Sequence, residues 1–386
     1  MALLSSFADG LGGFLFVLLS FLFVLTVVVF VHELGHFLVA RWCGVSVRAF
    51  SIGFGREIYG FYDRHGTRWR FAWIPLGGYV KFVDDDNAAS AGPSTRLDQL
   101  TPEERAGAFH TKPLWQRTAI VAAGPLANFL LAIVIFALMF SLIGIRTTAP
   151  RVDEVVPNSP AATAGFMPGD VILEIDGKRI DSFNEVLRIV STSPGRELTV
   201  KVDRNGQALT LTVVPERQEI EDSFGGTVVR GIIGIRRITT PDTTELRRAG
   251  PLEAVWLGVR ETQFIITSTL SYLGDVIIGR QSADQLGGPI RIAEVSGQVA
   301  KLGLEPLLNL IAVISVSIGL INLFPIPLLD GGHLLFYAIE ALRRKPLSER
   351  SQEIGFRIGL AVVLMLMVFA TLNDLPIVRR WLTGNG

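Results

Sequence analysis

Two histidines and a glutamate lie together in the segment His32-Glu33-Leu34-Gly35-His36. Because residues four apart lie on one face of an α-helix, His32 and His36 could offer two imidazole nitrogens to one metal ion. Imidazole suits zinc, and a catalytic zinc keeps one coordination position open. Glu33 lies beside that face, where its carboxylate could accept a proton from a water molecule. The spacing therefore predicts a hydrolytic zinc centre with Glu33 as its base.

The motif lies inside an apolar stretch. Residues 11–31 carry no charge, and residues 37–40 continue apolar. An ionisable side chain at the centre of a bilayer costs at least about 2.5 kcal/mol and usually has a function. The alternative is a chance match in a soluble helix with a solvated Glu33, which is rare in a chain that has five histidines. We therefore expect the metal site to lie within a membrane.

The composition is that of a membrane protein. Of the 386 residues, 49% are hydrophobic, and the mean hydropathy is +0.42. The 36 basic and 36 acidic residues balance, so no nucleic-acid partner is expected. Cys43 is the single cysteine, which excludes an intramolecular disulfide. Since a span needs about 20 apolar residues, we expect membrane spans at residues 12–40, 118–145, 307–329 and 358–372, the last being the weakest because it is short.

Basic residues concentrate in two of the connecting segments, 41–117 and 343–350. Loops rich in Lys and Arg stay on the cytoplasmic side. The insert between the second and third spans is therefore expected outside the cytoplasm. The first apolar stretch has no preceding basic residue and reads as a retained anchor rather than a cleaved signal. The polar stretch 84–102 is expected to form a flexible loop.

The insert has the pattern of a small β-rich domain. Residues 151–216 alternate with period two between turns such as Asp176-Gly177 and Asn205-Gly206, and residues 182–190 read as a short helix. The run from Ser159 to Asp170 resembles a bacterial PDZ domain, a fold that binds extended chain ends by strand addition. A β domain that acts only as a steric filter is the alternative. Residues 254–278 read as an amphipathic helix on the membrane surface, with an extra span as the alternative.

A third metal ligand must come from another segment, because two histidines leave a tetrahedral ion half-bound. The end of the third span reads Asn322-Leu-Phe-Pro-Ile-Pro-Leu-Leu-Asp330-Gly-Gly-His333. Asp330 is its sole acid, and the glycines that follow let the backbone turn. Broken backbone at membrane depth is tolerated where it lines a cavity. A helix terminator is the alternative role for Asp330, and His333 is a competing ligand that we rank lower.

Taken together, these motifs resemble those of the bacterial site-2 proteases, the M50-type intramembrane zinc metalloproteases. The resemblance covers nearly the whole chain. It implies a zinc endopeptidase with His32, His36 and Asp330 as zinc ligands and Glu33 as catalytic base. Two tandem PDZ domains occur in that family, whereas the insert here has room for one. The other segments that carry the resemblance are Gly53-Phe54-Gly55, Pro75 to Lys81, Gly124-Pro125-Leu126-Ala127-Asn128 and Gly287-Gly288-Pro289.

The resemblance also implies a membrane-associated β element at Pro75–Lys81, beside the substrate. A substrate helix must unwind before hydrolysis, and this element could pair with the unwound strand while Asn322 binds the strand's backbone. A plain turn and a helix-terminating side chain are the alternative roles. The expected substrates are single-pass membrane proteins in the lipid bilayer of a bacterial inner membrane, such as an anti-sigma factor of a stress response or remnant signal peptides. The expected substrate-binding residues are Gly77, Gly78, Tyr79, Val80, Asn322, Pro325 and Pro327.

We therefore expect a polytopic α-helical membrane protein of about four transmembrane helices, with an inserted small α/β PDZ-like domain and a membrane-associated β element. Two other functions compete: an inactive PDZ-bearing scaffold, which has no use for the zinc motif, and a metal transporter, whose polar residues would not cluster at one depth. The expected divisions are 1–41, the first span with the zinc motif; 42–114, a cytoplasmic loop with the β element; 115–146, the second span; 147–238, the PDZ-like domain; 239–304, interfacial helices; 305–330, the third span with the Asp ligand; 331–355, a cytoplasmic loop; and 356–386, the fourth span and tail.

Overall fold

The structure is a computed structural model that describes residues 2–84, 100–221, 227–238, 244–283 and 286–375. Most of the polar stretch 84–102, expected to be a loop, lies outside the described residues. The chain forms two compact units. The first comprises residues 1–136, 258–266 and 287–386, and the second comprises residues 137–257 and 267–286. Every residue proposed for the zinc centre belongs to the first unit.

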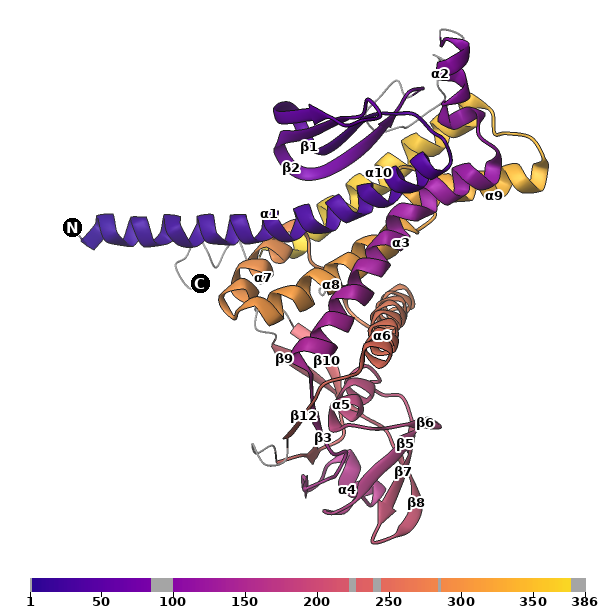
Figure 1. The fold of residues 1–386 in the computed structure, drawn as a ribbon. Coiled ribbons are helices and arrows are strands. Elements are labelled where there is room, and N and C mark those ends of the chain that lie inside the picture. Colours follow the sequence, from indigo (N-terminus) through magenta and orange to yellow (C-terminus); the bar gives the residue numbers. More distant parts are fainter. Residues whose placement is uncertain (1, 85–99, 222–226, 239–243, 284–285, 376–386) are drawn as a thin grey trace. The chain divides into compact units, whose positions relative to one another are not determined.

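Within the described residues, four helices are long and apolar enough to cross a membrane: Gly12–Trp42, Leu114–Ile143, Leu304–Asn322 and Glu349–Asn373. They belong to α1 (Ala2–Trp42), α3 (Leu114–Leu138) with the π-helical turn that follows it, α8 (Leu304–Asn322) and α10 (Glu349–Asn373) (Figure 1). The number of predicted spans is confirmed. The fourth is longer than its apolar stretch, because Ser348 caps the helix by accepting the Ser351 N–H. The helix α6 (Pro251–Ile277) is not among the four.

α1 and α3 pack closely at the turn of α1 that carries the histidines. Gly35 faces α3, where a Cβ atom at this position would lie 2.7 Å from Cβ of Ala127 and would overlap the carbonyl of Ala123. Small residues let two helix backbones approach in a membrane. Gly35 therefore brings α3 against the metal motif.

The element after α1 is a sheet made of two long strands, β1 (Val47–Tyr62) and β2 (Arg68–Phe82). Both strands bend, so that residues 68–72 pair with residues 57–62 and also with residues 49–52. Residues 78–82 pair with 47–52 on one side, and no described strand pairs with the other side of residues 78–81. The β element expected at Pro75–Lys81 is thus part of β2, and its residues 78–81 form an edge strand.

This sheet packs on α1 through aromatic residues. Phe50 of β1 is fully buried, with its ring centroid 5.4 Å from that of Phe37 in α1 and 4.4 Å from that of Trp69 in β2. Phe82 stacks on Phe109 at 4.9 Å. Phe109 begins a 3₁₀ turn that follows α2 (Pro102–Ala106) and precedes α3. The edge strand is therefore held at a fixed position relative to α1.

The segment between α8 and α9 (Asp330–Arg343) is irregular. Leu328 in this segment is a non-glycine residue with a positive φ, +130°. The expectation that Gly331 and Gly332 supply the turn is wrong, because both lie in the first turn of α9 without positive φ. They are needed for close packing instead: a Cβ atom at Gly332 would lie 2.5 Å from the carbonyl oxygen of Ile326, and one at Gly331 would overlap Leu323 and Phe324.

The helix α7 (Pro289–Lys301) packs on α1 and is joined to the end of α10. Asp374 is fully buried, and its carboxylate accepts the N–H groups of Gly288, Ile290 and Arg291 at the start of α7. A carboxylate at a helix N-terminus satisfies unpaired donors and the helix dipole. The Gly287-Gly288-Pro289 motif thus marks the start of this capped helix.

The second unit contains the small α/β insert. Its four-stranded antiparallel sheet has the order β6-β5-β7-β8 and packs with α4 (Pro160–Ala164) and α5 (Phe183–Ser191) around one core of residues such as Ile172, Val186 and Val200. The predicted small α/β insert and its short helix are confirmed. The strands are β3 (Ile145–Thr148), β4 (Glu154–Val155), β5 (Val171–Ile175), β6 (Lys178–Arg179), β7 (Leu198–Arg204), β8 (Gln207–Val213), β9 (Glu216–Glu221), β10 (Thr227–Ile232), β11 (Ile235–Arg236) and β12 (Thr244–Arg247).

Candidate metal centre

Three side chains from two helices converge in the first unit. Nε2 of His32 and Nε2 of His36, both on α1, lie 3.2 Å apart. Oδ2 of Asp330, at the start of α9, lies 3.1 Å from the first nitrogen and 3.5 Å from the second. Among the described residues this is the one group of three or more His, Cys, Asp and Glu side chains arranged to hold a metal ion. His333, the competing ligand, is not part of it.

The arrangement fits a zinc ion. Ligand atoms about 2.0–2.1 Å from a tetrahedral zinc lie about 3.3–3.4 Å from one another, close to the three separations observed here. Oδ2 of Asp330 is buried and receives no hydrogen bond. With neutral histidines, three lone pairs face one another at this point, and a cation between them would replace repulsion by attraction. The donor set of two imidazoles and one carboxylate is also one that catalytic zinc uses.

The outer nitrogens of both histidines face α3. Nδ1 of His36 lies 2.8 Å from the carbonyl oxygen of Ile120, to which it can donate. Nδ1 of His32 lies 3.2 Å from the amide of Asn128. Between these positions, Gly124 leaves room for the rings, because a Cβ atom there would lie 2.9 Å from Cε1 of His32 and would overlap His36. α3 therefore determines how the two imidazoles are oriented.

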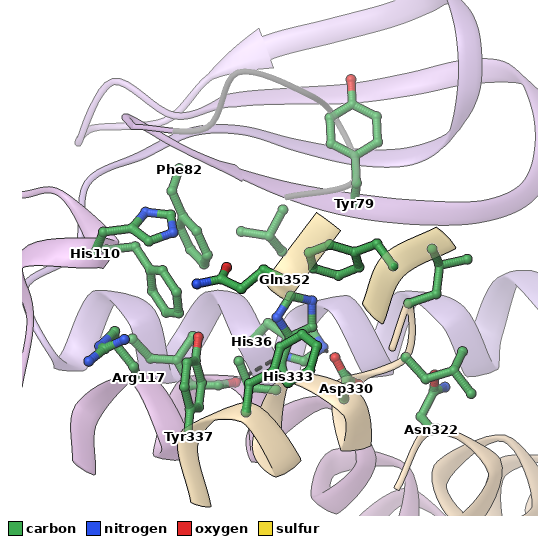
Figure 2. Close-up of a pocket in the computed structure, with 18 of the residues that line it drawn as sticks. His36, Tyr79, Phe82, His110, Arg117, Asn322, Asp330, His333, Tyr337 and Gln352 are labelled. Carbon is green, nitrogen blue, oxygen red and sulfur yellow. Dashed lines mark hydrogen bonds and ion pairs between the residues drawn. The ribbon is translucent and has the colours of Figure 1, made fainter. Parts of the chain in front are cut away.

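The centre opens into a cavity of about 540 Å³. His32, Glu33 and His36 line it together with four of the predicted substrate-binding residues, Gly78, Tyr79, Val80 and Asn322. In Figure 2, His36, His333 and Asp330 lie together between the sheet, which carries Tyr79, and the end of α8, which carries Asn322. The structure thus brings the metal motif, the sheet edge and the end of α8 to one cavity.

Glu33 lies directly beneath the sheet edge. A Cβ atom at Gly78 would lie 2.8 Å from Cγ of Glu33 and 2.8 Å from the carbonyl oxygen of Ser51. The absence of a side chain at position 78 thus lets β2 pass over the glutamate. The neighbouring Tyr79 points its hydroxyl away from the metal group (Figure 2), where it accepts a hydrogen bond of 2.9 Å from Arg70.

Three predicted substrate-binding residues do not line the cavity: Gly77, Pro325 and Pro327. Gly77 has φ of +134° and packs on the ring of Phe54. Pro327 lies against the first turn of α9 at Gly332 and against Gly359 of α10, where any side chain would overlap its carbonyl. Its observed contacts are thus with the elements that position Asp330.

The far end of the cavity is polar. Arg117 of α3 forms a two-point ion pair with Glu340 of α9, with N–O distances of 2.6 and 3.3 Å. His110 donates from Nδ1 to the buried carboxylate of Asp84 over 2.7 Å. Burial opposes the charged form of Asp84, but hydrogen bonds from the His110 ring and two backbone N–H groups outweigh it and hold the pKa of Asp84 below its usual range. Asp84 is thus an anion that fixes the chain leading into α3.

Sequence reasoning missed the residues that orient and support the site. Gly124 and Asn128 belong to a motif that supported the family resemblance but was given no role in the site. Gly359 was not predicted to have a role. Their spacing gives a partial signal: positions 124 and 128 lie four apart in α3 and so share one face, as do the two histidines of α1. Nothing in the sequence says that those two faces meet.

The comparisons with known proteins agree with this geometry. The family model for peptidase family M50 matches residues 20–366. A Rhizobium meliloti protein whose name describes it as a candidate zinc metalloprotease is 53% identical, over 95% of this chain and 96% of its own length. The metalloprotease MmpA of Caulobacter vibrioides is 42% identical, over 94% of this chain and 96% of its own. The regulator of sigma-E protease RseP of Escherichia coli is 33% identical, over 94% of this chain and 99% of its own.

Among solved structures, the PDZ domain of an SdrC-like protein of Listeria monocytogenes matches 24% of this chain and 88% of its own, with 23% identity and a TM-score of 0.19. The family itself is shown by the model match, which spans most of the chain, and by relatives of nearly full-length coverage. This chain belongs to peptidase family M50 and is a zinc metalloendopeptidase of the site-2 protease type.

Proposed function

We propose that this protein cleaves transmembrane segments of single-pass membrane proteins in a bacterial inner membrane, with His32, His36 and Asp330 as zinc ligands and Glu33 as catalytic base. One observation carries the proposal. The two histidines lie on a helix apolar enough to span a bilayer, and they meet the partly buried carboxylate of Asp330 at a cavity. This arrangement supports cleavage of peptide bonds within the membrane.

The chemistry follows from the residues around the cavity. Bound zinc supplies Lewis acidity, which lowers the pKa of water towards about 7 and polarises a carbonyl group. Glu33, next to His32 and lining the same cavity, accepts the proton of the attacking water and later donates it to the leaving amine. Gly78 lies over Glu33 and has no side chain. A substrate backbone can therefore approach the Glu33 carboxylate closely.

The substrate strand is proposed to lie along the free edge at residues 78–81. An unwound helix exposes N–H and C=O groups that must be paired in a dry environment. The edge of β2 offers unpaired backbone groups, and the amide of Asn322 at the end of α8 offers a further donor or acceptor within the cavity. Pairing with this edge would hold one peptide bond extended next to Glu33.

The orientation and the substrates are part of the proposal. The basic loops at 41–117 and 343–350 favour a cytoplasmic sheet and an extracytoplasmic PDZ-like insert. By analogy with RseP, whose name marks it as a regulator of sigma-E, we propose that an anti-sigma factor is one substrate and that remnant signal peptides are another class.

The test is cleavage in a defined membrane. Purified protein and a single-pass model substrate are placed in the same liposomes, and the products are mapped by mass spectrometry. We expect a cut within the transmembrane segment and none in a soluble peptide from the substrate's outer domain. A cut confined to soluble parts would refute the intramembrane assignment. The absence of any cut, with zinc bound, would favour the scaffold, and zinc flux into the same liposomes would favour the transporter.

A further inference from the structure

Asn128 of α3 faces the outer nitrogen of His32. Its amide Nδ2 lies 3.2 Å from Nδ1 of the histidine. Asn128 is fully buried, and its Oδ1 has no hydrogen-bond partner. A buried amide oxygen without a partner costs about 1–3 kcal/mol. We therefore expect the Asn128 Oδ1 atom to accept a hydrogen bond in the functional state.

The tautomer of His32 supplies the donor for this hydrogen bond. Its Nε2 faces Nε2 of His36 and Oδ2 of Asp330, so Nε2 is the atom that must offer a lone pair to a metal. A neutral imidazole with a lone pair on Nε2 carries its proton on Nδ1. That proton needs an acceptor. Rotating the Asn128 amide by half a turn exchanges two atoms of nearly equal size and places Oδ1 against the proton.

His36 shows the same arrangement. Its Nδ1 lies 2.8 Å from the carbonyl oxygen of Ile120, an atom that can only accept. Both histidines thus turn Nδ1 towards α3 and Nε2 towards Asp330. In one case the acceptor is a backbone carbonyl, and in the other it is the side chain of Asn128.

The backbone of Asn128 is itself held in place. Its carbonyl oxygen accepts a hydrogen bond of 2.8 Å from the hydroxyl of Ser315 in α8, and Ser315 is fully buried. Gly319, one turn further along α8, lies so close that a Cβ atom there would be 3.2 Å from Cβ of Asn128. The amide can therefore rotate about its own bond but cannot move away from His32.

We propose that Asn128 is a positioning residue that accepts a hydrogen bond from the Nδ1–H of His32 and so directs the lone pair of Nε2 at the zinc. The inference rests on the proposed role of His32 as a ligand. Groups that orient a metal-bound histidine in this way typically contribute about 10- to 100-fold in metal affinity. Asn128 acts through His32 and does not itself touch the metal or the substrate.

The experiment measures the zinc dissociation constant of the full-length protein in detergent by competition with a chelator. Asn128→Leu keeps the branched shape of the side chain but cannot accept a hydrogen bond, so we expect the constant to rise about 10- to 100-fold. Asn128→Asp keeps an acceptor, so we expect it to stay within a few-fold of the wild-type value. The matched control is Thr118→Val, which removes a hydroxyl of the same helix that donates to the carbonyl oxygen of Leu114. Its constant should not change.

Two results would overturn the inference: wild-type affinity in Asn128→Leu, or equal losses in the Leu and Asp variants, since packing alone would then explain the effect. If the Leu variant does not fold, Asn128→Ala replaces it in the same comparison with Asp. His32→Ala separates the two proposals. Zinc binding that survives in His32→Ala refutes the ligand assignment itself. Zinc binding that is lost there but unchanged in the Asn128 variants refutes only the positioning role.

Discussion

Gly124 of α3 lies so close to His36 of α1 that a methyl group at its Cα would overlap the Nε2 atom of the histidine. The same methyl group would lie 2.9 Å from Cε1 of His32. A glycine in the middle of a helix costs roughly 0.5–1 kcal/mol relative to alanine. The geometry explains why a glycine is needed here despite this cost, since the side chain of every other residue type would displace both imidazoles.

The first prediction is that Gly124→Ala abolishes or strongly weakens zinc binding although it favours the helix. The added methyl group must push His36 out of the arrangement with Asp330, because the α3 backbone that bears it is held by Gly35. Zinc content per chain, measured on purified protein, tests this. Gly274→Ala in α6 is the control, since nothing lies within 4 Å of a Cβ atom there. Equal zinc content in both variants would contradict the argument.

The second prediction separates the two candidates for the third ligand. Asp330→Ala should lose zinc, because its Oδ2 is the oxygen 3.1 Å from Nε2 of His32. His333→Ala should retain one zinc per chain, because the ring of His333 packs against Phe356, with centroids 5.5 Å apart, and lies outside the metal group. The reverse pattern of zinc loss would assign the ligand to His333.

The third prediction concerns Glu33 as the base. Glu33→Gln has the same size but cannot accept a proton, so zinc should remain bound while the cleavage rate falls by orders of magnitude. Zinc content and cleavage of the single-pass substrate are measured on the same preparation. Near-normal cleavage with zinc bound would remove Glu33 from the mechanism.

The sequence predicted the features that depend on local patterns. The spacing of His32 and His36 indicated a metal face on one helix, uncharged stretches indicated the spans, and period-two alternation between turns indicated the small β-rich insert. Each of these signals is carried by residues close together in the chain. The zinc motif also identified Asp330 indirectly, because it required a third ligand from an otherwise uncharged segment.

Features that depend on contacts between distant segments were not predictable in this way. Asn128 lies 96 residues from His32 in the sequence. It has a role only because Gly35 lets α3 pack against α1. The positive φ at Leu328 runs against the rule that assigns such conformations to glycine, and it is held by packing of the segment on α9 and α10. The same packing explains why the two glycines after Asp330 serve close contact rather than a turn.

The fourth prediction is that the insert restricts access but takes no part in the chemistry, since every proposed zinc-site residue lies outside it. β3 and β12 provide a clean excision point, because Thr148 pairs with Thr244 and the two strand ends are therefore adjacent. Replacing residues 149–243 by Asn-Gly should preserve cleavage of a short substrate and increase cleavage of substrates with intact outer domains. Loss of cleavage of the short substrate, with zinc still bound, would contradict a gating role.

Inside the insert, Asp170 forms a buried ion pair with Arg204 whose contribution to stability depends on pH. It is fully buried, and Arg204 approaches both of its oxygens at 2.7 and 2.8 Å. Burial opposes the charged form, but the hydrogen bonds from Arg204 and from the Met167 N–H outweigh it and hold the pKa of Asp170 below its ordinary value of 3.8. A carboxyl group whose pKa is lower in the folded state stabilises the fold above its unfolded pKa and loses that contribution as the pH falls through the folded value.

The fifth prediction is therefore that amide protection in β5 and β7, corrected for intrinsic exchange, is constant above about pH 5 and decreases below about pH 4. Hydrogen–deuterium exchange on the full-length protein measures it strand by strand. Asp170→Asn should lower the local stability by about 1–3 kcal/mol at neutral pH, because a neutral amide binds Arg204 less strongly, and should flatten the acid dependence. Asp181→Asn is the control, since its pair with Arg179 is largely exposed and contributes little. An acid dependence that is as steep in Asp170→Asn as in the wild type would assign the effect to other carboxyl groups.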